Sequence, residues 1–165
     1  MIVTIVGALA LTGCSSKKDD ARGAGDDSLV STDGPSTSGN FGTALDLGSG
    51  IKVTISEPKT FSPGTFASNY LPGQVANVFD VTIANAGTAS LDPSTISFAS
   101  ESGANTCSDV LDGDNGVSGA PTDAIGAGSS VNFKIAVGCD AKSGAPLHLT
   151  VTIGADSAAV DGKIA

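Results

Sequence analysis

The sequence predicts an all-β fold, an antiparallel β-sandwich of about seven strands, preceded by an apolar segment and a disordered tether. Beyond residue 40, apolar residues recur at every second position, and clusters of Gly, Asn, Asp and Pro separate these runs. The composition agrees, because 4% aromatic residues, no Trp and 22 Gly are typical of short strands joined by many turns. A chain of 165 residues is long enough for one such domain.

The first residues carry a targeting pattern. Residues 2–11 form an apolar run that has the length of a signal-peptide core and is too short to cross a bilayer as a helix. The motif Leu11-Thr12-Gly13-Cys14 follows and resembles the lipobox of bacterial lipoprotein precursors. The resemblance implies a diacylglyceryl group on Cys14 and removal of residues 1–13 as the signal peptide. Two acyl chains give stable membrane anchoring. The alternative is a buried strand or helix that ends at a cysteine by chance.

Residues 14–40 have the composition of a tether. They are dense in Ser, Gly and Asp and show no apolar periodicity. Such a segment cannot bury enough apolar surface to offset the entropy lost on ordering. We expect a lipidated Cys14 and flexible tether over residues 14–40, and the folded domain over residues 41–165.

Five segments of the predicted domain alternate apolar and polar residues, the pattern of strands with one buried face. The apolar positions are Ile51, Val53 and Ile55; Phe79, Val81 and Ile83; Ile96 and Phe98; Val131, Phe133, Ile135 and Val137; Leu147, Leu149, Val151 and Ile153. We expect edge strands near residues 41–47 and 158–164. No segment has the period of an amphipathic helix, so two antiparallel sheets packed face to face are the economical arrangement.

A family resemblance rests on two of these strands. Residues 78–88, VFDVTIANAGT, end a strand in Asn-x-Gly, and a Gly-rich turn at residues 126–130 precedes a later strand. With Phe98 between them, these features resemble the immunoglobulin-like domain of many bacterial lipoproteins and secreted antigens. The resemblance covers residues 47–153 and implies an immunoglobulin-like sandwich outside the cytoplasm. Members of that family are largely of unknown function, so it implies no reaction.

Cys107 and Cys139 remain once Cys14 is assigned to the lipid. In an oxidising compartment such a pair is expected to form a disulfide. Closing a loop of about 32 residues would stabilise the domain by roughly 3–4 kcal/mol. The alternative, a redox-active or metal-binding pair, lacks a CxxC spacing and a His nearby in the sequence.

The charge balance disfavours a basic binding surface. There are 8 Lys and Arg against 17 Asp and Glu, a net charge of −9, which argues against binding nucleic acid. His148 is the only histidine, and alternation places it opposite Leu147 and Leu149, so we expect a solvent-facing strand residue and not a catalytic base. We predict that the protein is not an enzyme and has no cofactor besides the covalent lipid on Cys14.

Two loops hold the remaining candidates. Asp109, Asp112 and Asp114 lie close together, and turn chemistry accounts for them better than calcium ligation, because the spacing does not fit a calcium-binding loop. We predict no metal site and keep weak calcium binding as the alternative.

The loop at residues 58–73 concentrates large apolar side chains outside the strands. The sequence favours their closing the sandwich core; otherwise they form an exposed patch and the candidate partner surface. These residues are Phe61, Phe66, Tyr70 and Leu71.

The predicted function is that of a lipid-anchored cell-envelope protein on the extracytoplasmic face of the cell membrane. It would act as a surface-displayed binding or interaction module with an unidentified ligand, because the fold is a scaffold and no catalytic constellation stands out. The alternatives are a structural or chaperone-like envelope component and, less favoured, an enzyme. The expected partners are the membrane, through the lipid, and an envelope polymer or another exported protein.

Overall fold

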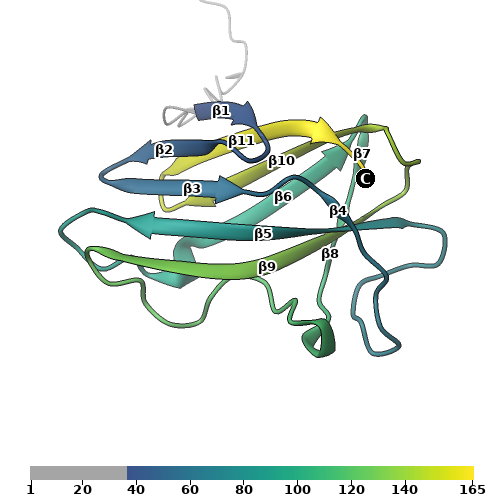
Figure 1. Ribbon diagram of the computed structural model, residues 1–165, viewed down its shortest axis with the longest axis horizontal. Coiled ribbons are helices and arrows are strands. Elements are labelled where there is room, and N and C mark those ends of the chain that lie inside the picture. Colours follow the sequence, from purple (N-terminus) through teal and green to yellow (C-terminus); the bar gives the residue numbers. More distant parts are fainter. Residues whose placement is uncertain (1–36) are drawn as a thin grey trace, which may run out of the picture. The chain divides into compact units, whose positions relative to one another are not determined.

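The computed structural model describes residues 37–165. The predicted signal peptide, Cys14 and most of the predicted tether lie outside the described residues. The described part contains eleven strands and two short 3-10 helices, η1 (Pro93–Thr95) and η2 (Gly113–Asn115). The strands form two sheets that face each other, with β5 and β9 in front of β6 in Figure 1. The all-β sandwich predicted from the sequence is confirmed.

The first sheet has five strands in the order β1-β11-β10-β6-β7. All its pairings are antiparallel except that of β1, which runs parallel to β11. Its strands are β1 (Thr37–Asn40), β6 (Ile96–Ser102), β7 (Asn105–Thr106), β10 (Pro146–Ile153) and β11 (Asp156–Lys163).

The second sheet has six strands in the order β2-β3-β5-β9-β8, and β4 pairs with β5 beside this path. Every pairing in it is antiparallel. Its strands are β2 (Ala44–Gly48), β3 (Ile51–Ile55), β4 (Lys59–Thr60), β5 (Val75–Asn85), β8 (Ser108–Val110) and β9 (Ser129–Cys139). The predicted strands correspond to β2, β3, β5, β6, β9, β10 and β11.

The strand β1 lies within the segment predicted to be tether, so the predicted domain boundary at residue 41 is wrong. Thr37 to Asn40 pair in register with Ala158 to Asp161. The pairing uses backbone groups, which is why Ser and Gly serve here without an apolar pattern. Gly39 also lies against Leu45, whose Cδ2 would be 2.7 Å from a Cβ at that position. The folded part therefore begins no later than Thr37.

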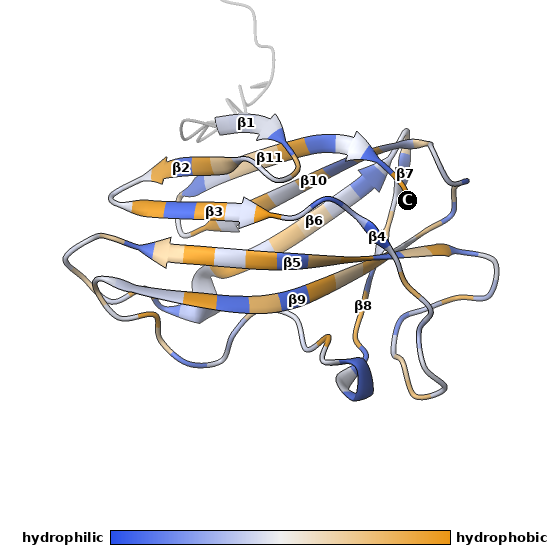
Figure 2. Cartoon of the chain, in the orientation of Figure 1, coloured by the Kyte–Doolittle hydropathy of each residue, from blue (hydrophilic) through white to orange (hydrophobic). Residues whose placement is uncertain are grey.

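The core lies between the two sheets and is built from the alternating residues. Phe79, Val81 and Ile83 of β5 are fully buried, and Leu149 and Val151 of β10 face them from the other sheet within one core cluster. Figure 2 shows the alternation as changes from orange to blue along β3 and β5. Burying one face of each strand supplies the main driving force for this fold.

Two phenylalanine pairs mark different regions of the core. Phe41 and Phe79 stack with ring centroids 5.4 Å apart, and Phe41 lies so close to Gly162 that any Cβ there would clash with its ring. Phe98 and Phe133 meet edge to face at 6.0 Å, and both are only partly buried. The second pair therefore lies where the sandwich is less closed.

The Asn-x-Gly turn after β5 is held by the side chain of Asn85, which is buried. Its Nδ2 donates to the carbonyl oxygens of Ala89 and Ile125, both at 2.9 Å, and its Oδ1 accepts from the Gly87 N–H at 3.0 Å. A side chain at position 87 would collide with the Ser49 carbonyl oxygen. Both motif residues thus have a structural role at this end of the sandwich.

Candidate functional site

A second, smaller apolar cluster lies on the outer face of the second sheet. Ile135 and Val137 of β9 point into the sandwich core, so Ala136 between them faces outward. Ala136 is nevertheless buried, because two loops fold back over it. The cluster consists of Val110, Val117 and Ala136, with Phe61, Ala67, Tyr70 and Val78 packed against them.

The two loops are tied to each other; we call residues 61–74 and 111–120 the paired loops. The Gly64 N–H donates to Oδ2 of Asp112 at 2.7 Å. Ser68 and Leu111 exchange two backbone hydrogen bonds, of 2.8 and 3.2 Å. Segments far apart in the sequence therefore act as one unit on the outside of the sheet.

The four candidate partner residues divide into two pairs. Phe61 and Tyr70 pack into the small outer cluster, and the Tyr70 hydroxyl donates to the Gln74 carbonyl oxygen at 3.0 Å. Phe66 and Leu71 are exposed, at 84% and 60%. The expectation that this loop closes the sandwich core is wrong, because its anchoring residues cover the outer face of β9 and not the space between the sheets.

Leu111 joins Phe66 and Leu71 as an exposed apolar residue of the paired loops, with 43% of its surface accessible. Within residues 37–165 these three are the only large hydrophobic side chains that are exposed. Sequence reasoning missed Leu111. Its position directly after Val110 was the available signal. Neighbouring residues of an extended segment point to opposite faces, so when Val110 is buried Leu111 faces away from it.

The three acidic residues weighed as calcium ligands do not converge. Asp112 is buried and accepts hydrogen bonds from the Gly64 N–H and from Nδ2 of Asn115, both at 2.7 Å. These donors lower the pKa of its carboxyl, the Gly64 N–H foremost. Asp109 pairs with Val137, so its side chain is directed to the other face of the sheet, where it remains exposed. Among the described residues, no group of three or more His, Cys, Asp or Glu side chains could hold a metal ion.

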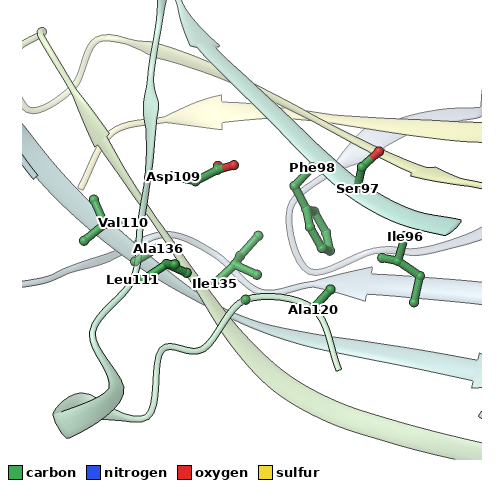
Figure 3. Close-up of a pocket in the computed structure, with 10 residues that line it drawn as sticks. Ile96, Ser97, Phe98, Asp109, Val110, Leu111, Ala120, Ile135 and Ala136 are labelled. Carbon is green, nitrogen blue, oxygen red and sulfur yellow. The ribbon is translucent and has the colours of Figure 1, made fainter. Parts of the chain in front are cut away.

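A cavity of about 230 Å³ opens between the sheets beside the paired loops. Figure 3 shows the side chains of Phe98 and Ile135 projecting into it from opposite sheets, with the Asp109 carboxyl turned toward the same space. Burial raises the pKa of the Asp109 carboxyl above its ordinary value. The residues that line the cavity include Ile96, Phe98, Asp109, Leu111, Ala120 and Ile135.

His148 lies on the outer face of the first sheet. Its Nδ1 is 2.7 Å from Oδ1 of Asp161, its cross-strand neighbour on β11, and its Nε2 is 3.2 Å from Oγ1 of Thr150. The imidazole is 38% exposed. Both contacts follow from the register of β10 and β11, since residues two apart on one strand share a face. His148 therefore connects β10 to the neighbouring strand β11 by a side-chain contact on a solvated face.

The disulfide predicted from the sequence is present and joins Cys107 to Cys139, with Cα atoms 4.4 Å apart. Both cysteines are buried in the main core. Cys139 ends β9, and Cys107 lies between the short strands β7 and β8. The bond therefore fixes the start of the segment that leads into Asp109 and the paired loops.

Comparisons with known proteins identify a structural class. No family model matches the chain, and no curated protein matches it. A candidate lipoprotein of Bacillus subtilis, ycdA, is similar in structure over 72% of this chain, with a TM-score of 0.59 and 18% identity. At that identity the likeness supports the fold, and this chain spans 38% of the length of the ycdA chain.

An uncharacterised β-sandwich protein from Clostridium difficile is similar over 89% of this chain and 99% of its own, with 12% identity and a TM-score of 0.47. Of the residues that the structure describes, none belongs to a helix with the length and apolar character needed to cross a membrane.

Proposed function

We propose that the protein is a lipid-anchored binding module of the cell envelope that contacts another exported protein through its paired loops. One observation carries this proposal. The large exposed apolar side chains of the described domain, Phe66, Leu71 and Leu111, all lie on two loops that are hydrogen-bonded to each other. Exposed apolar side chains on a rigid support are typical of protein interaction sites.

The extracytoplasmic address rests on the sequence. The lipobox motif ending at Cys14 supplies the anchor, and the Cys107–Cys139 disulfide fits an oxidising compartment. The structural likeness to a candidate lipoprotein of Bacillus subtilis supports the same class. The immunoglobulin-like family and lipidation of Cys14 belong to this proposal.

The charge around the paired loops defines the chemistry of the partner. Residues 60–74 carry no charged side chain. Residues 108–128 carry four aspartates, of which Asp112 is buried, and neither Lys nor Arg. The whole chain has a net charge of −9. A complementary partner surface is therefore apolar at its centre and basic at its rim, since opposite potentials favour encounter and register.

Photo-crosslinking in intact cells tests the proposed surface. A photo-reactive residue at position 66 should give a discrete protein adduct, whereas the same group at exposed Lys52 of β3 should not. Leu111→Ser should remove the adduct at position 66, because it takes away one apolar contact without altering the hydrogen bonds between the loops. Equal crosslinking from positions 66 and 52, or adducts with lipid alone, would contradict the proposal.

Cell fractionation tests the anchor separately. The protein should sediment with membranes and carry lipid on Cys14, and the Cys14→Ser variant should appear in the soluble fraction or remain unprocessed. Wild-type protein that is unacylated and soluble would rule out the anchor and leave the binding surface to be judged by crosslinking.

A further inference from the structure

The cavity beside the paired loops exists because two strands are short. β7 pairs only with Glu101 and Ser102 of β6, and β8 pairs only with residues 136–138 of β9. The start of β6 and the middle of β9 therefore lie at one open edge of the sandwich. Between them the inner faces of the two sheets separate enough to leave about 230 Å³ of space.

Most of the cavity lining is apolar and comes from both sheets. Ile96 and Phe98 belong to β6, and Ile135 belongs to β9. Ala120 and Leu111 of the paired loops close the remaining side (Figure 3). An apolar cavity of about 150 Å³ already accommodates a benzene molecule, so this one has room for a ring with a short substituent.

One carboxylate faces this apolar space. Asp109 is paired with Val137 across β8 and β9, and Val137 is part of the main core. Directly paired residues share a face of the sheet, so the Asp109 side chain is directed between the sheets. None of the ion pairs within residues 37–165 involves it, and its pKa is shifted by burial alone. Asp109 is itself exposed to solvent, so the cavity combines an apolar body with one carboxylate at its open side that forms no ion pair.

We propose that this cavity binds small aromatic or aliphatic ammonium compounds. The apolar group packs between Ile96, Phe98 and Ile135, and the protonated amine donates hydrogen bonds to Asp109. The charge favours a cation, because an ammonium ion supplies both the donor and the counter-charge that this carboxylate lacks. The pocket shares Leu111 with the protein-binding surface proposed above. Its ligand is recognised by Asp109 and by residues between the sheets, so the inference does not depend on that surface being correct.

A purely structural account of Asp109 makes a different prediction. Charged residues that point inward on edge strands protect β-sheets from pairing with other chains. If Asp109 served only that purpose, the cavity would have no preference for cations over neutral molecules of the same shape. A matched pair of probes separates the two accounts.

The test is an NMR titration of the full chain with benzylamine and, in parallel, with benzyl alcohol at neutral pH. Benzylamine should shift resonances of Ile96, Ala120 and Ile135 and bind about tenfold or more tightly than the alcohol, as expected for one charge-assisted hydrogen bond. Asp109→Asn should abolish that preference. Asp114→Asn, an acidic residue of the paired loops outside the cavity, should leave it unchanged.

The Ala120→Leu variant provides a steric test, because the larger side chain occupies the cavity without changing the charge. It should weaken binding of both probes while the rest of the spectrum is retained. Equal affinity for the two probes, an unchanged preference in Asp109→Asn, or shifts confined to other regions would overturn the inference. Crosslinking from position 66 would be unaffected by that failure, so the two proposals can be judged apart.

Discussion

The backbone N–H of Gly64 donates a hydrogen bond to Oδ2 of Asp112, 2.7 Å away and 48 residues later in the chain. The same carboxylate oxygen accepts from Nδ2 of Asn115. One buried aspartate thus orients its own turn and holds the neighbouring loop against it. The exposed apolar residues of both loops depend on this contact for their relative positions.

Replacing Asp112 with Ala should loosen the paired loops while leaving the sandwich folded. Amide exchange at Gly64 and Ser68 should become faster by about tenfold, the change expected for losing one hydrogen bond to a charged group. Exchange in β5 and β9 should be unchanged. Asp114→Ala is the matched control, and the same acceleration in that variant would show that the Asp112 hydrogen bonds do not hold the loops.

The same contact predicts a response to acid. The pKa of Asp112 is lowered by the Gly64 and Asn115 donors, so its stabilising contribution is present above the unfolded-state pKa of about 3.9 and is lost as the pH falls through the lower folded-state value. Amides of the paired loops in the wild type should therefore lose protection from exchange once the pH falls below the folded-state pKa of Asp112. The Asp112→Ala variant should lack this component of the pH dependence.

Asp109 should have the opposite pH dependence, because burial raises its pKa. A raised folded-state pKa gives a contribution that is fully present below the unfolded-state value of about 3.9 and is lost as the pH rises through the folded-state value. Asp109→Asn should therefore increase the free energy of unfolding at neutral pH relative to wild type. In acid, where both side chains are neutral, the difference should disappear. Urea unfolding at the two pH values measures it, and equal differences at both would refute the assignment.

Asn85→Ala should be destabilising, because it removes the three hydrogen bonds that this buried side chain makes to the carbonyl oxygens of Ala89 and Ile125 and to the Gly87 N–H. A loss of about 2–4 kcal/mol in the free energy of unfolding is expected from removing three hydrogen bonds of one buried side chain. Asn132→Ala is the control, since Asn132 is exposed and accepts from the Thr82 hydroxyl on the sheet surface. If the two variants lost equal stability, the Asn-x-Gly motif would have no special role in the fold.

The alternating pattern was sufficient to predict the main strands and the buried face of each. It could not predict β1, β4, β7 and β8, which have two to four residues and are held by backbone pairing. The alternation places Ala136 on the outer face of β9, but it gave no sign that Ala136 and the nearby Gly138 are buried. Such small residues accept a covering loop as readily as water.

Only part of the candidate site could be predicted from the sequence. Phe66 and Leu71 stood out by composition. The inward direction of Asp109 depends on the register of β8 against β9, and no local pattern specifies that register over three residues. The hydrogen bond between Gly64 and Asp112 joins residues 48 positions apart in the sequence, so turn propensities alone could not predict it.

Removing β1 should cost stability, even though the sequence places it in the tether. A fragment beginning at Phe41 loses the parallel pairing of Thr37–Asn40 with β11 and should be less stable than one beginning at Thr37 by about 1–3 kcal/mol, given the net value of a few backbone hydrogen bonds. The control is Thr37→Ala in the longer fragment, which removes only the exposed hydrogen bond to the Asp46 carbonyl oxygen. Equal stability of the two fragments would restore the boundary at residue 41.

The disulfide should stabilise the domain and, in particular, the edge that carries the cavity. Cys107 and Cys139 are separated by 32 residues. Closing a loop of that length lowers the entropy of the unfolded chain and so stabilises the folded state by about 3–4 kcal/mol. In the folded chain the bond fixes the start of β8, which is only three residues long and carries Asp109. Few other contacts hold so short a strand in register. Loss of the bond should therefore reduce protection from amide exchange more in residues 108–120 than in the rest of the domain.

The double variant Cys107→Ala/Cys139→Ala should therefore lower the free energy of unfolding by about 3–4 kcal/mol and increase amide exchange most in residues 108–120. The strands β10 and β11, which pair over eight residues, should keep the slowest exchange. Cys14→Ser is the matched control for loss of a cysteine without loss of the bond. A double variant with unchanged exchange at Asp109 and Val110 would mean that the pairing of β8 with β9 holds this edge without help from the disulfide.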